Sequence, residues 1–147
     1  MKKLRFILIS IVVLLTSGRA AAYDFESGGL YYNILDADAK TVEVTLQGEK
    51  DGWQTQSTYF GEITIPATVT NGVDTYTVKS IGQYAFCRSD ITSLKVEEGV
   101  ETIVNEAFLS CYSLTSVSLP SSLRTIGVSS FFNCYQLAEI VIPEGVT

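Results

Sequence analysis

The sequence contains no histidine and only 3 cysteines. Without histidine, the chain has no Ser-His-Asp or Cys-His nucleophilic group and no histidine ligand for a metal. Three cysteines are too few for a four-cysteine zinc site. The residues therefore predict no catalytic site, no cofactor and no metal site, and we expect a protein that is not an enzyme.

The chain also lacks an apolar run long enough to span a membrane, which takes about 20 residues. Its most apolar stretch, residues 6–15, follows three basic residues and precedes three consecutive alanines at 20–22. This order is typical of a secretory signal peptide. We predict that residues 1–22 are a signal peptide cleaved after Ala22. The mature chain, from Tyr23, is then expected to be secreted or held at the cell surface, with no membrane span of its own.

The two signs of charge are unevenly distributed. The signal segment holds four of the ten basic residues and none of the sixteen acidic ones. The mature chain therefore has six basic and sixteen acidic residues, which gives a formal charge of −10. Such a surface repels nucleic acid and anionic lipid, so we expect no nucleic acid among its partners.

An internal repeat organises the C-terminal half. Segments 78–99, 100–122 and 123–145 carry the same residue types in the same positions, with a step of 23 residues except where the first segment is one residue shorter. A period in this range predicts a solenoid, because one unit buries its apolar face only against the next. The recurring residues that we expect in the core are Ile81, Phe86, Ile103, Phe108, Ile126, Phe131, Leu137, Ile140 and Ile142.

Each unit combines two local patterns. Its last part alternates apolar and other residues like a short strand, which Pro120 and Pro143 end in the second and third units. Its middle part, such as residues 105–108, lacks that alternation and predicts a helical or 3₁₀ turn whose phenylalanine fills the core. We therefore expect a β-rich α/β solenoid.

The repeat V-x-x-I-G-x-x-A-F-x-x-C-x-x-L-x-x-V-x-I-P resembles the BspA-like leucine-rich repeats of secreted and surface proteins from bacteria of the mouth and gut. The resemblance covers residues 78–147, as three repeats and the start of a fourth, and it departs from the pattern at Glu97, Val104 and Ser130. It implies a right-handed leucine-rich repeat solenoid. It also implies a binding protein in surface adhesion, whose partners are extracellular proteins or bacterial surface components.

The N-terminal part, residues 23–77, has no 23-residue period. Residues 42–46 alternate like a strand, and Asn71-Gly72 predicts a hairpin turn because both residues tolerate positive φ. The segment 63–66 matches the strand and proline that end a repeat. We interpret residues 23–77 as an N-terminal β-hairpin cap with a degenerate repeat, and residues 48–58 as an exposed loop.

The outward positions of the repeat strands form the candidate partner-binding face, because they alternate with positions expected in the core. They are Ser93, Lys95, Ser116, Ser118, Glu139 and Val141. One alternative is a carbohydrate-binding module that uses Trp53 and Tyr59, since exposed rings stack on sugars. Another is a truncated remnant of a longer repeat array. We expect Tyr32 and Phe60 to lie in the core.

Two features of the repeats leave open questions. Cys111 and Cys134 occupy the same position in adjacent units, so they form either a ladder of small buried side chains or a disulfide, whereas Cys87 is out of register. The last unit has no following unit to cover its strand. We therefore expect this unit to fray or to associate with a second copy of the chain.

Overall fold

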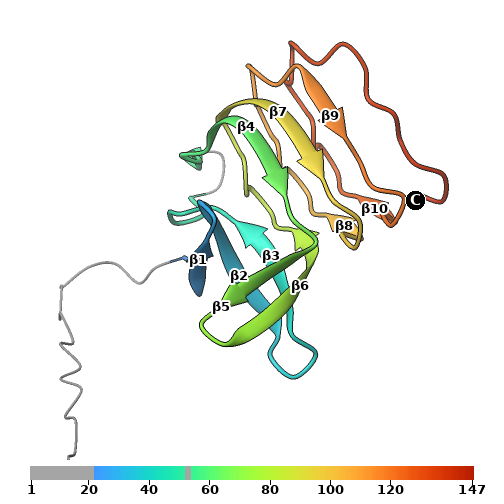
Figure 1. Ribbon diagram of the computed structural model, residues 1–147. Helices are drawn as coiled ribbons and strands as arrows, with labels where there is room; N and C mark the ends of the chain where they lie inside the picture. The colour runs from blue at the N-terminus through green and yellow to red at the C-terminus, as the bar shows by residue number, and fades with distance from the viewer. Residues whose placement is uncertain (1–21, 52–53) are drawn as a thin grey trace, which may run out of the picture.

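The computed structural model describes residues 22–51 and 54–147. The strands of this part are β1 (Phe25–Ser27), β2 (Leu30–Asp36), β3 (Thr41–Thr45), β4 (Phe60–Ile65), β5 (Thr68–Asn71), β6 (Asp74–Ile81), β7 (Asp90–Val96), β8 (Thr102–Ile103), β9 (Ser116–Ser118) and β10 (Thr125–Ile126). They form two sheets, one ordered β1-β2-β3-β6-β8-β10 with β5 also paired to β6, and one ordered β4-β7-β9. Figure 1 shows both sheets, with β4, β7 and β9 side by side. The predicted signal peptide lies outside the described residues, apart from Ala22.

The repeats stack as coils that contribute to both sheets. Parallel pairing places Ile81 of β6, Ile103 of β8 and Ile126 of β10 at equivalent positions. The 23-residue step therefore becomes the distance from one strand to the next, as the repeat predicts. Ile81 and Ile103 are fully buried, and Ile126 is half-buried.

Aromatic rings fill the space between the sheets. The rings of Phe86, Phe108 and Phe131 are stacked at centroid distances of 5.0 Å, and Tyr59 continues the stack 4.6 Å from Phe86. Phe86 and Phe108 are fully buried, as predicted. Phe131 is only half-buried, because its coil has a neighbour on one side only.

The middle part of each coil is not helical, which corrects the α/β part of the predicted fold. Single i→i−3 hydrogen bonds do occur, such as Cys87 N–H to the Tyr84 carbonyl at 3.1 Å. The N–H of Phe86, however, donates to Ala107 of the next coil at 2.8 Å. Tyr84 and Arg88 have positive φ, of 60° and 52°, and their counterparts in the later coils repeat this. In a helix, the backbone N–H groups donate to carbonyl groups of the same helix. Here some of them donate to carbonyl groups of the next coil, so these hydrogen bonds join neighbouring coils.

The last coil differs most from the sequence prediction. Residues 139–142 form no strand in the described structure. Leu137 and Ile140 are half-buried, and Ile142 is 47% exposed, so the prediction that Ile142 is buried is wrong. The physical reason is that these side chains have no further coil to pack against within the described residues.

The segment before the repeats contains the matching strand and the expected hairpin. β4 pairs in parallel with β7, so that Ile63 lies beside Leu94. In the hairpin of β5 and β6, Asn71 pairs with Asp74, so the two-residue loop is Gly72-Val73, one residue later than predicted. Gly72 supplies the positive φ of 62° that such a turn requires, while Asn71 stays in the strand.

The antiparallel strands β1, β2 and β3 extend the first sheet, and β3 runs parallel to β6. Tyr32 of β2 is fully buried, as expected. The loop after β3, which was predicted to be exposed over residues 48–58, is less exposed than that, because Thr55 and Ser57 are buried. The N–H of Ser57 donates to the Cys87 carbonyl at 2.8 Å, which ties the loop to the first coil.

Candidate functional site

The parallel strands β4, β7 and β9 place outward side chains in two rows. Strand pairing aligns Glu62 with Ser93 and Ser93 with Ser116. One step along the strands, it likewise aligns a second row, which consists of Thr64, Lys95 and Ser118. Residues two apart in a strand project from the same side, so the two rows share one surface. We call these six residues the sheet face.

The sheet face lines a shallow groove of about 400 Å³. Ile63, Leu94 and Val117 lie between the rows and also line the groove, but their side chains turn toward the core, where Leu94 is 2% exposed. Four of the six rim residues carry a hydroxyl group, and the two charges, on Glu62 and Lys95, have opposite sign. The face therefore offers hydrogen-bonding groups with little net charge, which suits contact with the polar surface of another protein.

Charged residues beside the face hold the coils together. The Glu98 carboxylate accepts hydrogen bonds from the backbone N–H groups of Ser121 and Ser122, at 2.9 and 3.1 Å. These bonds, the Ser121 backbone bond foremost, lower the pKa of Glu98 below its usual value. Lys95 is 4.0 Å from Glu97, a distance at which an exposed pair contributes little to stability. Lys95 therefore remains available to a partner.

The structure brings four of the six predicted face residues together: Ser93, Lys95, Ser116 and Ser118 all line the groove. Glu139 and Val141 are exposed, but they lie on the last coil where no strand forms. Val141 lines a different groove, beside Ser118. These two residues therefore extend the surface at its edge and do not continue the two rows.

Three outward residues of β4 are not among those predicted from the sequence. Phe60, Glu62 and Thr64 alternate with the more buried residues of this strand, and Phe60 is 77% exposed. The expectation that Phe60 lies in the core is wrong, because its position in the strand points to the outward side. The sequence did contain an indication of these positions. Segment 63–66 matches the strand and proline that end a repeat, and this match assigns Glu62 and Thr64 to outward positions.

The residues of the carbohydrate alternative lie elsewhere. Tyr59 is only 6% exposed, and its hydroxyl donates to the Thr45 carbonyl at 2.7 Å and accepts from the Tyr31 N–H at 2.9 Å. Burial raises the pKa of Tyr59 well above its usual value. A ring held in this way is not accessible to a sugar. Trp53 lies outside the described residues.

The three cysteines are free and buried. The Cys111 thiol donates to the Phe86 carbonyl at 3.0 Å, and the Cys134 thiol repeats the contact with the Phe108 carbonyl at 3.2 Å. The contact with Cys134 and burial raise the pKa of Cys111. Of the two alternatives, the structure shows the ladder of buried side chains and not the disulfide.

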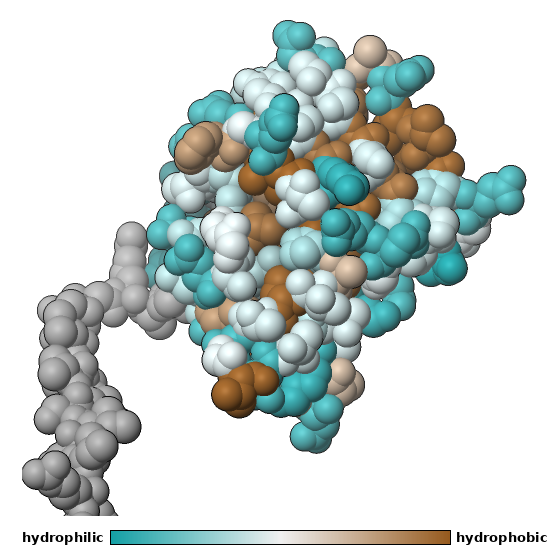
Figure 2. All heavy atoms as spheres, viewed as in Figure 1, coloured by the Kyte–Doolittle hydropathy of each residue, from teal (hydrophilic) through white to brown (hydrophobic). Residues whose placement is uncertain are grey.

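Apolar side chains gather in a second area, on the last coil. Figure 2 shows them at the upper right, where Figure 1 places the C-terminal coil. The large exposed hydrophobic residues of the last coil are Val128, Phe132, Tyr135, Val141 and Ile142. Within the described residues there is no group of three or more potential metal ligands and no helix long and apolar enough to cross a membrane.

Comparison with known proteins identifies relatives of this architecture. The family model for the BspA type leucine rich repeat region matches residues 56–147, in six copies. A leucine-rich repeat protein from Bacteroides ovatus is 31% identical with a TM-score of 0.69, over 84% of this chain and 30% of that chain. One from Bacteroides capillosus is also 31% identical with a TM-score of 0.69, over 83% of both chains.

A leucine rich cell surface protein from Faecalibacterium prausnitzii is 29% identical with a TM-score of 0.64, over 88% of this chain and 38% of that chain. The chain thus spans less than half the length of two of these three structures. No curated protein shows significant similarity to it.

Proposed function

The chain belongs to the BspA-type leucine-rich repeat family, and from this premise we propose that it is a non-catalytic, exported binding protein. Its role in this proposal is adhesion at the cell surface. It contacts extracellular proteins or bacterial surface components through the sheet face. In the same proposal residues 1–22 are a signal peptide, residues 23–77 an N-terminal cap and residues 78–147 the right-handed repeat array.

The observation that carries the proposal is the alignment of outward side chains across β4, β7 and β9. Three strands present outward side chains at the same heights, so the surface is regular, and four of its six side chains carry a hydroxyl group. Phe60 adds an exposed aromatic ring at the start of β4. Aromatic residues, phenylalanine included, are enriched in the buried centre of protein interfaces.

The proposed location at the cell surface is supported by two further observations. The Faecalibacterium relative is described as a cell surface protein. The N-terminal sequence has the pattern of an export signal. Because three strands bury little area, one copy binds weakly, and several copies at a surface gain affinity by acting together.

Binding of the mature chain to immobilised extracellular-matrix proteins and to whole bacterial cells tests the proposal. Phe60→Ala removes the exposed ring at the start of β4, next to the face, and the pair Ser116→Arg with Ser118→Arg alters the sheet face itself. All three positions are exposed, so the fold is retained. We expect each change to reduce binding at least about tenfold, which corresponds to one lost interface anchor.

Matched variants serve as controls. Phe132→Ala removes an exposed ring of the last coil, and Thr125→Arg adds a charge to β10 of the other sheet. Both should bind like the unmodified chain. If the controls reduce binding as much as the face variants, or if the face variants bind normally, the sheet face is not the contact surface.

A further inference from the structure

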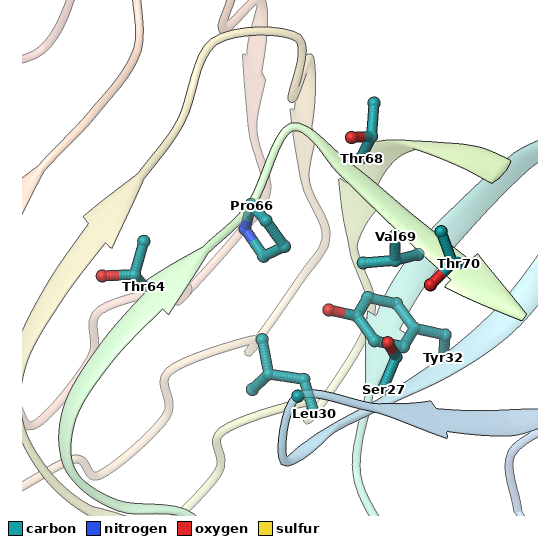
Figure 3. Close-up of a pocket in the computed structure, with 9 residues that line it drawn as sticks. Ser27, Leu30, Tyr32, Thr64, Pro66, Thr68, Val69 and Thr70 are labelled. Carbon is teal, nitrogen blue, oxygen red and sulfur yellow. The ribbon is translucent and has the colours of Figure 1, made fainter.

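A separate pocket lies where the turn between β1 and β2 meets the corner between β4 and β5 (Figure 3). Its volume is about 270 Å³. Leu30, Pro66 and Val69 provide apolar walls, and the hydroxyl-bearing residues Ser27 and Thr70 lie among them. Among the described residues that line the pocket, none carries a charge. The pocket therefore suits an uncharged ligand with both polar and apolar surface.

Tyr32 contributes an unsatisfied hydroxyl to this pocket. Its side chain is fully buried, and its hydroxyl has no hydrogen-bond partner among the described residues. Figure 3 shows this hydroxyl pointing into the gap between Leu30 and Pro66. Tyr59, another buried core tyrosine, has both a donor and an acceptor for its hydroxyl. A buried hydroxyl without a partner destabilises a fold, so its position at a pocket points to a ligand that satisfies it.

The chemistry of the pocket narrows the class of ligand. The Tyr32 hydroxyl is protonated near neutral pH, like any tyrosine hydroxyl, and burial raises its pKa further, so it can donate to an oxygen of the ligand. The surrounding hydroxyl groups can both donate and accept. A sugar ring presents hydroxyl groups at its edge and C–H groups on its faces, which matches hydroxyl groups beside apolar walls. The volume is slightly below the range of about 300–1,000 Å³ typical of drug-sized ligands, so one ring fits better than a chain.

We propose that this pocket binds a single ring of a neutral saccharide, with the Tyr32 hydroxyl donating a hydrogen bond to one of its oxygens. The site is distinct from the sheet face, although Thr64 borders both. The inference does not depend on protein binding at that face. It also differs from the carbohydrate alternative of the sequence analysis, because neither Trp53 nor Tyr59 takes part.

The test is an NMR titration of the ¹⁵N-labelled mature chain with methyl α-glucoside, methyl α-galactoside and N-acetylglucosamine. We expect at least one sugar to shift the amide signals of residues 27–32 and 66–70. Tyr32→Phe should lower the affinity for this sugar about tenfold, which is the effect of one lost hydrogen bond. The same change should raise the urea midpoint of unfolding, because it removes a buried unsatisfied hydroxyl. The opposite signs of the two effects separate loss of a ligand contact from damage to the fold.

A matched pair of variants tests the position of the site. Thr68→Trp places a large ring at the pocket rim and should abolish the shifts, whereas Thr75→Trp places it at an exposed position of the paired strand β6 and should not. Methyl α-glucuronide, which carries a carboxylate, should bind more weakly than methyl α-glucoside.

Three results would overturn the inference: no shifts with any neutral sugar, unchanged affinity in Tyr32→Phe, or equal effects of the two tryptophan variants. Each leaves the proposal for the sheet face intact, because Phe60→Ala tests that face with different ligands.

Discussion

Phe108→Ala tests how the coils are held together. The Phe108 ring is fully buried and lies 5.0 Å from a ring on either side, those of Phe86 and Phe131. Truncating a buried phenylalanine to alanine costs about 3–5 kcal/mol, and each lost ring pair contributes about 0.5–1.5 kcal/mol. We expect the loss of stability to be near the upper end of the range for truncation, because two ring pairs are lost and a cavity remains between the two neighbouring coils. A domain of ordinary stability, about 5–15 kcal/mol, barely tolerates this loss.

Urea unfolding followed by circular dichroism measures the effect. Two other alanine variants provide the scale. Phe131→Ala should cost less than Phe108→Ala, because Phe131 is half-buried and stacks on one ring. Phe132→Ala should change stability by about 0.5 kcal/mol or less, because that ring is 59% exposed. A loss below about 1 kcal/mol for Phe108→Ala, or equal losses for the three variants, would refute the stacking argument.

Three further predictions concern other parts of the structure. Gly127→Ala should lower the urea midpoint because its Cβ would lie 2.4 Å from backbone of the preceding coil, whereas Gly48→Ala, with nothing within 4 Å, should not. Sedimentation of the mature chain should show concentration-dependent association that Val141→Lys reduces. Val73→Lys, at the exposed hairpin tip, should leave it unchanged; a monomer at all concentrations would contradict this. All three thiols should react with Ellman's reagent at pH 8 only after addition of urea, because they are buried and the pKa of Cys111 is raised; fast reaction of the folded chain would contradict this.

The sequence predicted most accurately what the repeat itself determines. A period of fixed length places equivalent residues side by side, so the burial of Phe86 and Phe108 and the alignment of Ser93 with Ser116 followed from counting alone. The sequence did not reveal the turns between the strands. Positive φ at Tyr84 and Arg88 arises because the backbone bonds to the next coil, and residue type does not encode that preference.

The wrong predictions of burial fall at the two ends of the repeat region, in the last coil and at the start of β4. Ile142 has the residue type and position of a core strand, yet it is 47% exposed because no other coil among the described residues packs on it. Tyr59 is buried and the adjacent Phe60 is exposed, because successive side chains of an extended segment point to opposite sides. Residue type alone favoured the exposed position for Tyr59 and the core for Phe60, and the pairing of β4 with β7 reverses both.

The most direct test of the central claim is a hydrogen-deuterium exchange footprint of the mature chain, with and without a matrix protein or bacterial surface protein that it binds. The account predicts slower exchange on binding in residues 60–65, 90–96 and 116–118, the three strands of the sheet face. It predicts no change in β6, β8 and β10 of the other sheet. Protection confined to β6, β8 and β10, or to the last coil, would contradict the assignment of the sheet face as the binding surface.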